Sequence, residues 1–380
     1  MTAVIPAGVE IARDLVGPAM SAAVSRLSPD VGEVAAYHLG LTYVPAAAVG
    51  AANGSAVVPG PRPSAARNSA AKDRAAKNGA VNGSAAAAAA RPGGAGKALR
   101  PALALLSARA AGESAHRGVP AAVAVELVHN FSLLHDDIMD GDTERRHRPT
   151  AWTVYGVGAA ILAGDALLAL AQDILLEDNA AQGLWAARCL SAAVHRLIAG
   201  QGADLAFERR DDVTLPECLE MAGDKTAALM ACACSIGAIH VGAPAALAMG
   251  LASFGAHVGL AFQLTDDLLG IWGAPERTGK PIGSDLRARK KSLPVVAALA
   301  SGGPAAGRLR ELLTQEAPLT DGDVALATRL VEDAGGRSWT EAEAETQLAA
   351  AGKCLAESDL PGDVRAEFTS IAEFITARDT

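Results

Sequence analysis

The chain has 380 residues, of which half are apolar and only 3% aromatic, and its formal net charge is −9. Alanine is the commonest apolar residue and the best helix former, whereas the aromatic residues that favour strands are scarce, so the composition predicts an all-α fold. The acidic balance argues against nucleic acid as a partner.

The cysteines and the apolar runs indicate a soluble protein of a reducing compartment. The five cysteines are an odd number without paired spacing, which is not typical of a disulfide framework. No run reaches about 18 uninterrupted apolar residues, so no membrane span is expected. The first residues lack the basic region and apolar core of a signal peptide, and we therefore expect a cytoplasmic location.

An amphipathic helical pattern occupies residues 8–40. Residues 46–95 differ in character, because Ala, Gly, Ser, Pro and Asn fill them and leave little to bury, which predicts a disordered linker. Six basic residues against Asp73 alone give this segment a net charge of +5, which leaves −14 for the other parts of the chain. The segment is either a passive spacer or a basic tether that docks on an acidic partner.

From residue 96 onward, long helical patterns alternate with short turns that contain Gly and Pro, and no strand-like alternation or fixed repeat is present. Residues 320–380 show an amphipathic helical pattern, which favours a packing role. We therefore expect three parts: an N-terminal helix in 1–45, the linker in 46–95, and a helical bundle in 96–380.

Two aspartate clusters lie inside apolar helical runs. The first is the sequence from Asp136 through Asp137 to Asp140, and the second is Asp266 with Asp267. Buried carboxylates are costly unless cations meet them, and residues four apart share one helix face. Two such faces turned toward each other form an oxygen-ligand site suited to Mg²⁺, which takes its other ligands from phosphates and water. The alternative for either cluster alone is a solvated helix face or a helix start.

Basic residues recur around these clusters and suit diphosphate binding. Arginine pairs bind phosphate oxygens with two parallel hydrogen bonds, and a cation at a helix start adds to the positive end of the helix dipole. The candidates are Lys97, Arg100, Arg145, Arg146, Lys225, Lys280 and Lys290. A charged surface explains any one of these groups, but it does not explain their order around two acidic clusters.

Several motifs follow one another along the chain: GKxxRP from Gly96, ExxH followed by HDDxxD up to Asp140, an arginine pair followed by PT, then GQ, KT, FQxxDD and GKxxGxDL up to Leu286. The order of these motifs resembles that of the trans-isoprenyl diphosphate synthases, the polyprenyl synthetases. The resemblance extends from about Gly96 to Pro294. It implies an all-α bundle around a central cavity, usually in a homodimer.

The resemblance also implies a reaction, in which isopentenyl diphosphate condenses with an allylic diphosphate in the presence of Mg²⁺. It assigns Asp136 and Asp140 to two metal ions and Asp266 to a third, with Asp137 and Asp267 beside them. It assigns the allylic diphosphate to Arg145, Lys225, Gln263, Lys280 and Lys290. It assigns isopentenyl diphosphate to Lys97, Arg100, His129 and Arg146. The oxygens of Thr226 and Gln263 would stabilise the carbocation.

Three further residues match the motifs less decisively. His135 is more typical of a packed helix histidine than of a substrate ligand, whereas the motif match favours a functional role for His129. Gln201 and Asp204 fit the GQxxD pattern, and they are either supporting residues around the diphosphate site or structural ones.

Product length should depend on the side chains one helical turn before Asp136, namely Phe131 and Ser132. A bulky ring at 131 limits chain growth, whereas Ser132 leaves space beside it. This pair resembles that of the geranylgeranyl diphosphate synthases, with farnesyl diphosphate as the nearest competing product.

Two positions depart from the family pattern. Gly270 stands where the second cluster usually has a third aspartate, which removes a carboxylate and leaves a non-condensing partner subunit as one alternative. Arg289 replaces a common glycine before Lys290, and we expect little structural effect from it. A class I terpene cyclase is another alternative, although it would not need Lys97, Arg100 or Arg146. Some similar synthases with such linkers are packaged in protein shells, so 46–95 is a candidate binding segment.

Overall fold

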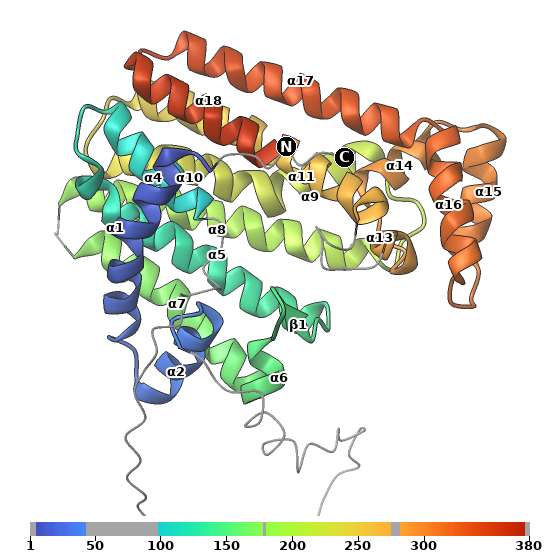
Figure 1. Ribbon diagram of the computed structural model, residues 1–380, viewed down its shortest axis with the longest axis horizontal. Helices are drawn as coiled ribbons and strands as arrows, with labels where there is room; N and C mark the ends of the chain where they lie inside the picture. Colours follow the sequence, from blue (N-terminus) through green and yellow to red (C-terminus); the bar gives the residue numbers. More distant parts are fainter. Residues whose placement is uncertain (1–4, 43–97, 178–179, 275–281, 377–380) are drawn as a thin grey trace, which may run out of the picture.

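The structure is a computed structural model that describes residues 5–42, 98–177, 180–274 and 282–376. Nearly all described residues that have regular structure are helical, and the strands are two residues long each (Figure 1). The predicted all-α fold is confirmed. The segment 46–95 and the residues Lys97 and Lys280 lie outside the described residues.

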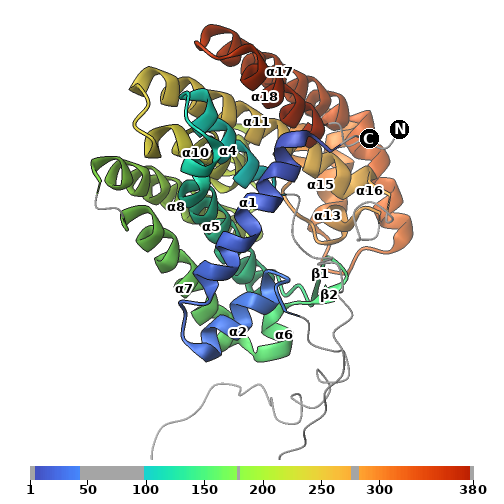
Figure 2. The same ribbon diagram turned by 60° about the vertical axis from the view of Figure 1, so that its left-hand side comes forward.

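The N-terminal pattern forms two helices rather than one, because the chain turns before Pro29. These helices are α1 (Ala7–Val24) and α2 (Pro29–His38). Proline fits the first position of a helix, where its missing N–H is not needed. Figure 2 shows α1 running across α5 and α2 lying beside α6, and both N-terminal helices contribute side chains to the main core.

The middle of the chain forms the central bundle. Its elements are α4 (Leu99–Ala110), a short 3₁₀ turn (Ala115–Gly118), α5 (Val119–Met139), β1 (Glu144–Arg145), β2 (Arg148–Pro149), α6 (Ala151–Tyr155), α7 (Val157–Leu176), α8 (Ala181–Phe207), α9 (Leu215–Ala222), a π-helical turn (Gly223–Ala227), α10 (Ala228–His240) and α11 (Ala245–Trp272). Long α5, α8, α10 and α11 run roughly side by side (Figure 1).

The rest of the chain covers one side and one end of that bundle. Its helices are α13 (Ser284–Arg287), α14 (Leu293–Ala300), α15 (Gly303–Thr314), α16 (Asp321–Asp333), α17 (Gly336–Glu357) and α18 (Gly362–Thr376). The tail predicted as amphipathic helix is therefore three helices. In Figure 1, α17 and α18 lie along the top of the bundle, and α15 and α16 project at its right-hand end.

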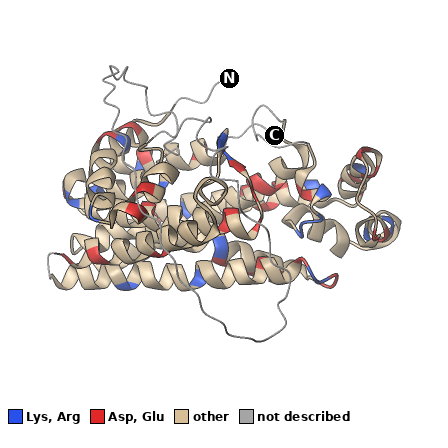
Figure 3. Cartoon of the chain, turned by 90° about the horizontal axis from the view of Figure 1, so that it is seen from below, with Lys and Arg blue, Asp and Glu red and all other residues tan. Residues whose placement is uncertain are grey.

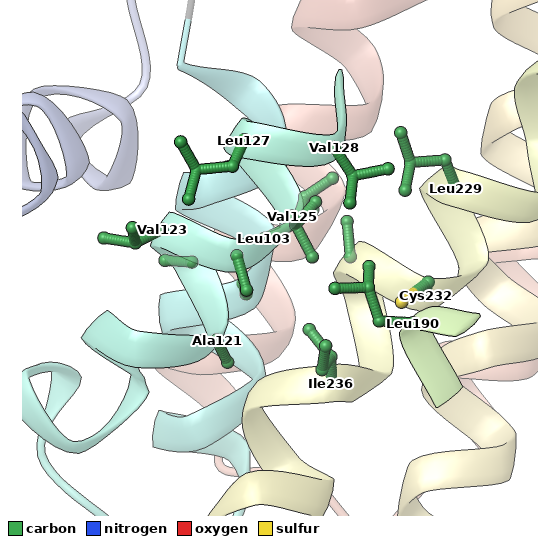
Figure 4. Close-up of a cluster of buried hydrophobic side chains, with 14 of the residues drawn as sticks. Leu103, Ala121, Val123, Val125, Leu127, Val128, Leu190, Leu229, Cys232 and Ile236 are labelled. Atoms are coloured by element: carbon green, nitrogen blue, oxygen red, sulfur yellow. The ribbon is translucent and has the colours of Figure 1, made fainter. Parts of the chain in front are cut away.

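The core consists of aliphatic side chains from facing helices. Figure 4 shows Leu103 of α4, Val128 of α5, Leu190 of α8 and Ile236 of α10 meeting in one cluster. All four side chains are fully buried. Truncating such a side chain to alanine costs about 2–5 kcal/mol. The helices that carry the aspartate clusters are therefore held rigidly by tight packing on their other faces.

Two helices, α7 and α11, are long and apolar enough to cross a membrane when only length and composition are considered. Buried helices of soluble proteins meet the same criterion, and 39% of the most apolar window in each is buried inside this structure. The helix α11 also carries Asp266 and Asp267. The finding is weak support for a membrane span, and the absence of one stays a prediction.

Candidate active site

The first aspartate cluster lies at the C-terminal end of α5. Asp136 and Asp137 are in its last turn, and Asp140 is the residue that ends the helix. Burial raises the pKa of Asp136 to about 6, opposed by Lys225 and reinforced by Asp140. Asp140 itself is exposed. The predicted shared face is therefore half-buried, with one carboxylate inside and one at the surface.

Asp137 points into the protein, and it binds an arginine of the following hairpin. Its side chain is 2% exposed and accepts a hydrogen bond of 2.6 Å from Nε of Arg145. Burial raises the pKa of Asp137, and Arg145 opposes that rise. Its second oxygen has no hydrogen-bond partner among the described residues. Asp137 therefore serves as the anchor of Arg145.

The hairpin that carries the two arginines is short and strained. Its strands pair Arg145 with Arg148, and its tip consists of Arg146 and His147 with φ of 53° and 59°. Such left-handed conformations cost about 1–2 kcal/mol for a residue with a side chain. Strain of this kind persists where surrounding contacts hold the backbone, and it is common at functional sites.

The helix α2 supplies those contacts. The hydroxyl of Tyr37 donates a hydrogen bond of 2.8 Å to the carbonyl of Pro149, and the Arg148 guanidinium lies 4.5 Å above the Tyr37 ring. Tyr37 and His38 line a pocket of about 30 Å³ together with Arg145 and Arg148. Burial and the nearby arginines lower the pKa of His38 to about 3, so this imidazole is neutral.

A second basic group lies between α4 and α5. Arg100 donates to Nε2 of His129 over 3.3 Å, and the Arg100 guanidinium also interacts with the carboxylate of Glu126. Burial lowers the pKa of His129, and Arg100 and Arg146 lower it further, so the ring is a neutral acceptor for Arg100. The structure therefore brings Arg100, His129 and Arg146 together as predicted.

The second aspartate cluster has one buried and one exposed carboxylate. Asp267 is 5% exposed and accepts hydrogen bonds from Nε2 of Gln263 at 2.7 Å and from the backbone of Leu293 at 2.8 Å. Burial raises its pKa to about 7. Asp266 is exposed on the neighbouring position of α11. Thr226 donates to the oxygen of Gln263 at 2.6 Å, which fixes the orientation of the amide.

Two lysines link the clusters. Lys225 lies in the π-helical turn, a rare distortion that is frequent at functional sites, and its ammonium donates to Asp204 at 2.5 Å. Lys290 is buried, which lowers its pKa, but four carboxylates outweigh this effect and raise its pKa overall. They are Asp204, Asp267, Asp285 and Asp140. Lys290 therefore interacts with both aspartate clusters at once.

The structure accounts for the missing third aspartate. A β-carbon added to Gly270 would lie 2.2 Å from a carboxylate oxygen of Asp285 and 2.5 Å from its carboxyl carbon. The carboxylate of Asp285 therefore lies against α11, one turn after Asp266, where a side chain at 270 would begin. Gly270 leaves room for the carboxylate of Asp285, the aspartate of the GKxxGxDL motif, so an acidic group of α13 lies beside the second cluster.

Arg289 changes the backbone requirement at this turn, and its expected small effect stays a prediction. Its φ is 54°, a left-handed conformation that glycine adopts without strain and arginine does not. The guanidinium donates to the carbonyl of Ala317, which helps to hold the turn before Lys290.

The remaining predicted residues lie close to the clusters. Gln201 is 6% exposed, and neither of its amide atoms has a hydrogen-bond partner among the described residues. Phe131 is 6% exposed, and the hydroxyl of Ser132 donates to the carbonyl of His129 at 2.9 Å. His38 is absent from the candidates that the sequence motifs gave, because 90 residues separate it from His129. Glu126 is absent from them as well, although the ExxH spacing placed it on the same helix face.

These residues fit Mg²⁺ that binds together with a diphosphate. Within the described residues, no three His, Cys, Asp or Glu side chains converge closely enough to hold an ion. Mg²⁺ usually binds through one or two carboxylates and completes its shell with phosphates and water. Asp136 has a raised pKa, so an added cation would favour its charged form, and the carboxylates of Asp140 and Asp266 are exposed. The three ions remain an expectation.

Comparison with known proteins decides the family. Residues 85–331 match the family Polyprenyl synthetase. The chain belongs to the polyprenyl synthetases. A (2E,6E)-farnesyl diphosphate synthase of Mycobacterium tuberculosis is 50% identical over 286 residues, 74% of this chain and 80% of that protein. A geranylgeranyl diphosphate synthase of the same organism is 45% identical over 290 residues, 76% and 81% of the two chains.

Solved structures agree with this assignment. A polyprenyl synthetase from Streptomyces coelicolor A3(2) has a TM-score of 0.82 and 46% identity, and the match covers 98% of this chain and 99% of that one. A polyprenyl synthase from Caulobacter crescentus CB15, complexed with calcium and isoprenyl diphosphate, has a TM-score of 0.68 and 32% identity over 75% and 86% of the two chains. This polyprenyl synthetase is a short-chain prenyltransferase, an enzyme of isoprenoid biosynthesis.

Proposed function

We propose that this polyprenyl synthetase uses Mg²⁺ to condense isopentenyl diphosphate with an allylic diphosphate, and that its main product is geranylgeranyl diphosphate, with 20 carbons. The observation that carries the proposal is the separation of two cationic groups. Arg100 and Arg146 form one group around the neutral ring of His129, whereas Lys225 and Lys290 form another between the aspartate clusters. Two diphosphates can therefore bind side by side.

The residues support the following reaction. Lys225 and Lys290 bind the allylic diphosphate, and the allylic C–O bond breaks with its electron pair leaving on the diphosphate. Mg²⁺ held by Asp136, Asp140 and Asp266 would supply positive charge that stabilises this leaving group. The oxygen of Thr226 would stabilise the resulting carbocation. The double bond of isopentenyl diphosphate, held by Arg100 and Arg146, attacks the cation, and the released diphosphate accepts the proton that is lost.

Farnesyl diphosphate, with 15 carbons, is the second candidate product. The 50% identity to a farnesyl diphosphate synthase favours it, whereas the pairing of Phe131 with the small Ser132 favours the longer product. A terpene cyclase would not require Arg100 and Arg146. A non-condensing subunit is disfavoured, because Asp285 occupies the space beside Gly270 and the Gln263–Asp267 hydrogen bond is intact.

The substitution Arg100→Gln tests the two-site proposal. Losing a charge-assisted contact to a diphosphate costs about 2–5 kcal/mol, so KM for isopentenyl diphosphate should rise by at least about tenfold. The affinity for the allylic diphosphate should stay unchanged in equilibrium binding. If Arg100→Gln lowered the affinities for isopentenyl diphosphate and for the allylic diphosphate equally, the proposal of two separate sites would be contradicted. Arg117→Gln, on the 3₁₀ turn away from the clusters, is the matched control.

We also propose that the protein is a homodimer. Large apolar side chains are exposed along α7 and α8, among them Leu162 and Trp185 at 59% each and Ile198 at 51%. In Figure 3 the tan parts of the chain, which are residues other than Lys, Arg, Asp and Glu, make up most of the helices. Several large apolar side chains exposed on two neighbouring helices are typical of a protein interface. Cytoplasmic location and a protein partner for 46–95 stay predictions, the latter tested by deleting 46–92 and comparing the proteins that co-purify.

A further inference from the structure

The side chain of His135 packs against Phe131, the residue proposed to limit product length. The two rings meet edge to face, with centroids 4.8 Å apart and planes at 68°. Both rings project from α5, one turn apart, and the His135 side chain is 22% exposed. Edge-to-face pairs are favoured by the ring quadrupoles, so His135 restricts the positions that the Phe131 ring can adopt.

The imidazole of His135 is itself held against α7. Its Nε2 lies 3.2 Å from the carbonyl of Ile161 and 3.7 Å from a carboxylate oxygen of Asp165. A β-carbon added to Gly164 would lie 2.4 Å from Nε2 and 2.6 Å from Cδ2 of the same ring. Only glycine at 164 leaves space for the imidazole, so α7 determines where His135 lies.

We propose that Gly164 and His135 are positioning residues for product length, acting through Phe131. This inference rests on the proposed elongation activity and on the role of Phe131 as the floor of the product cavity. The Phe131 ring cannot swing away from a growing chain while His135 fills the space behind it. Gly164 determines how far back the His135 ring lies, and therefore how deep the cavity is.

Two substitutions should change product length in opposite directions. His135→Ala removes the ring behind Phe131, so the Phe131 ring can retreat and longer products should accumulate. Gly164→Ala places a methyl group where the imidazole lies, which pushes that ring toward Phe131 and should shorten the products. Each ratio of neighbouring products should shift by about three- to tenfold, the range expected for one aromatic contact.

The experiment is elongation of farnesyl diphosphate with labelled isopentenyl diphosphate and Mg²⁺, with products separated by length. Gly158→Ala is the matched control, because an added β-carbon there meets nothing within 4 Å on the same helix. It should leave the product distribution unchanged. His135→Phe restores a ring behind Phe131, and its products should be no longer than those of the wild type. Melting temperatures identify any variant that is unfolded.

The outcomes distinguish a failure of the proposed elongation activity from a failure of the positioning role of His135 and Gly164. If the wild type fails to elongate farnesyl diphosphate, the proposed function with its 20-carbon product is wrong and this inference falls with it. If the wild type elongates but both His135→Ala and Gly164→Ala give its product distribution, only this inference is overturned. It is also overturned if His135→Phe lengthens the products as much as His135→Ala does.

Discussion

The Gly270 position shows how a side chain can be excluded by a group from a distant part of the chain. Asp285 lies 15 positions further along, and its carboxylate fills the space next to the Gly270 α-carbon. Sequence spacing identified Gly270 as a missing carboxylate, but the spacing could not show that another carboxylate had taken the space. That relation depends on how α13 packs on α11.

Placing the family's third aspartate at position 270 should therefore lower both the stability and the activity of the protein. Gly270→Asp introduces a β-carbon that overlaps Asp285, and overpacking of this kind costs about 1–3 kcal/mol of unfolding free energy. Elongation activity should fall rather than rise. Gly202→Asp on α8 is the control, because an added β-carbon there meets nothing within 4 Å. A Gly270→Asp variant that is more active and equally stable in urea would contradict the steric account.

The pH dependence of stability should report the burial of Asp267. Its pKa in the folded protein is raised from 3.8 to about 7. The folded state then binds the proton more tightly than the unfolded state, so the stabilisation is complete below about pH 4 and is lost as the pH rises through 7. Without metal, the unfolding free energy should fall more between pH 4 and 7 in the wild type than in Asp267→Asn. If urea titrations gave the same fall in unfolding free energy between pH 4 and 7 for both proteins, this prediction would be contradicted.

At the scale of elements, the helices were predictable and the hairpin was not. Alanine-rich segments with apolar residues at helical spacing form helices wherever they pack, so α5, α8 and α11 follow from the sequence. The hairpin has strands of two residues, which give no alternation to recognise. The partner of the hairpin is α2, and the segment 43–97 separates α2 from the bundle in sequence, so no local pattern links them.

Removing the Tyr37 hydroxyl should test the support that α2 gives to the hairpin. Tyr37→Phe deletes the hydrogen bond to Pro149 and leaves the ring under Arg148 in place. The loss should cost about 0.5–1.5 kcal/mol. If that support orients Arg146, KM for isopentenyl diphosphate should rise several-fold with kcat nearly unchanged. Tyr155→Phe is the control, because its hydroxyl contacts Glu33 and not the hairpin. A fall in kcat alone would contradict the positioning role.

At the scale of the whole molecule, the fold class and the order of the motifs could be predicted, because they depend on local composition and on spacing along the chain. The exposed apolar side chains of α7 and α8 could not, since apolar residues lie on both the buried and the exposed sides of these helices and only packing shows which of them stay exposed. Trp185→Lys places a charge among these side chains, so sedimentation should show a smaller species than for the wild type. Gln182→Lys, outside the apolar set, is the control. An unchanged sedimentation coefficient would place the interface elsewhere.

The central claim is that this polyprenyl synthetase elongates an allylic diphosphate with isopentenyl diphosphate. The most direct test is incubation of the full chain with Mg²⁺, isopentenyl diphosphate and each allylic diphosphate in turn, with the products identified by mass. The account predicts linear prenyl diphosphates, with geranylgeranyl diphosphate as the main product. Cyclic hydrocarbons, or no elongation by the intact protein, would contradict it.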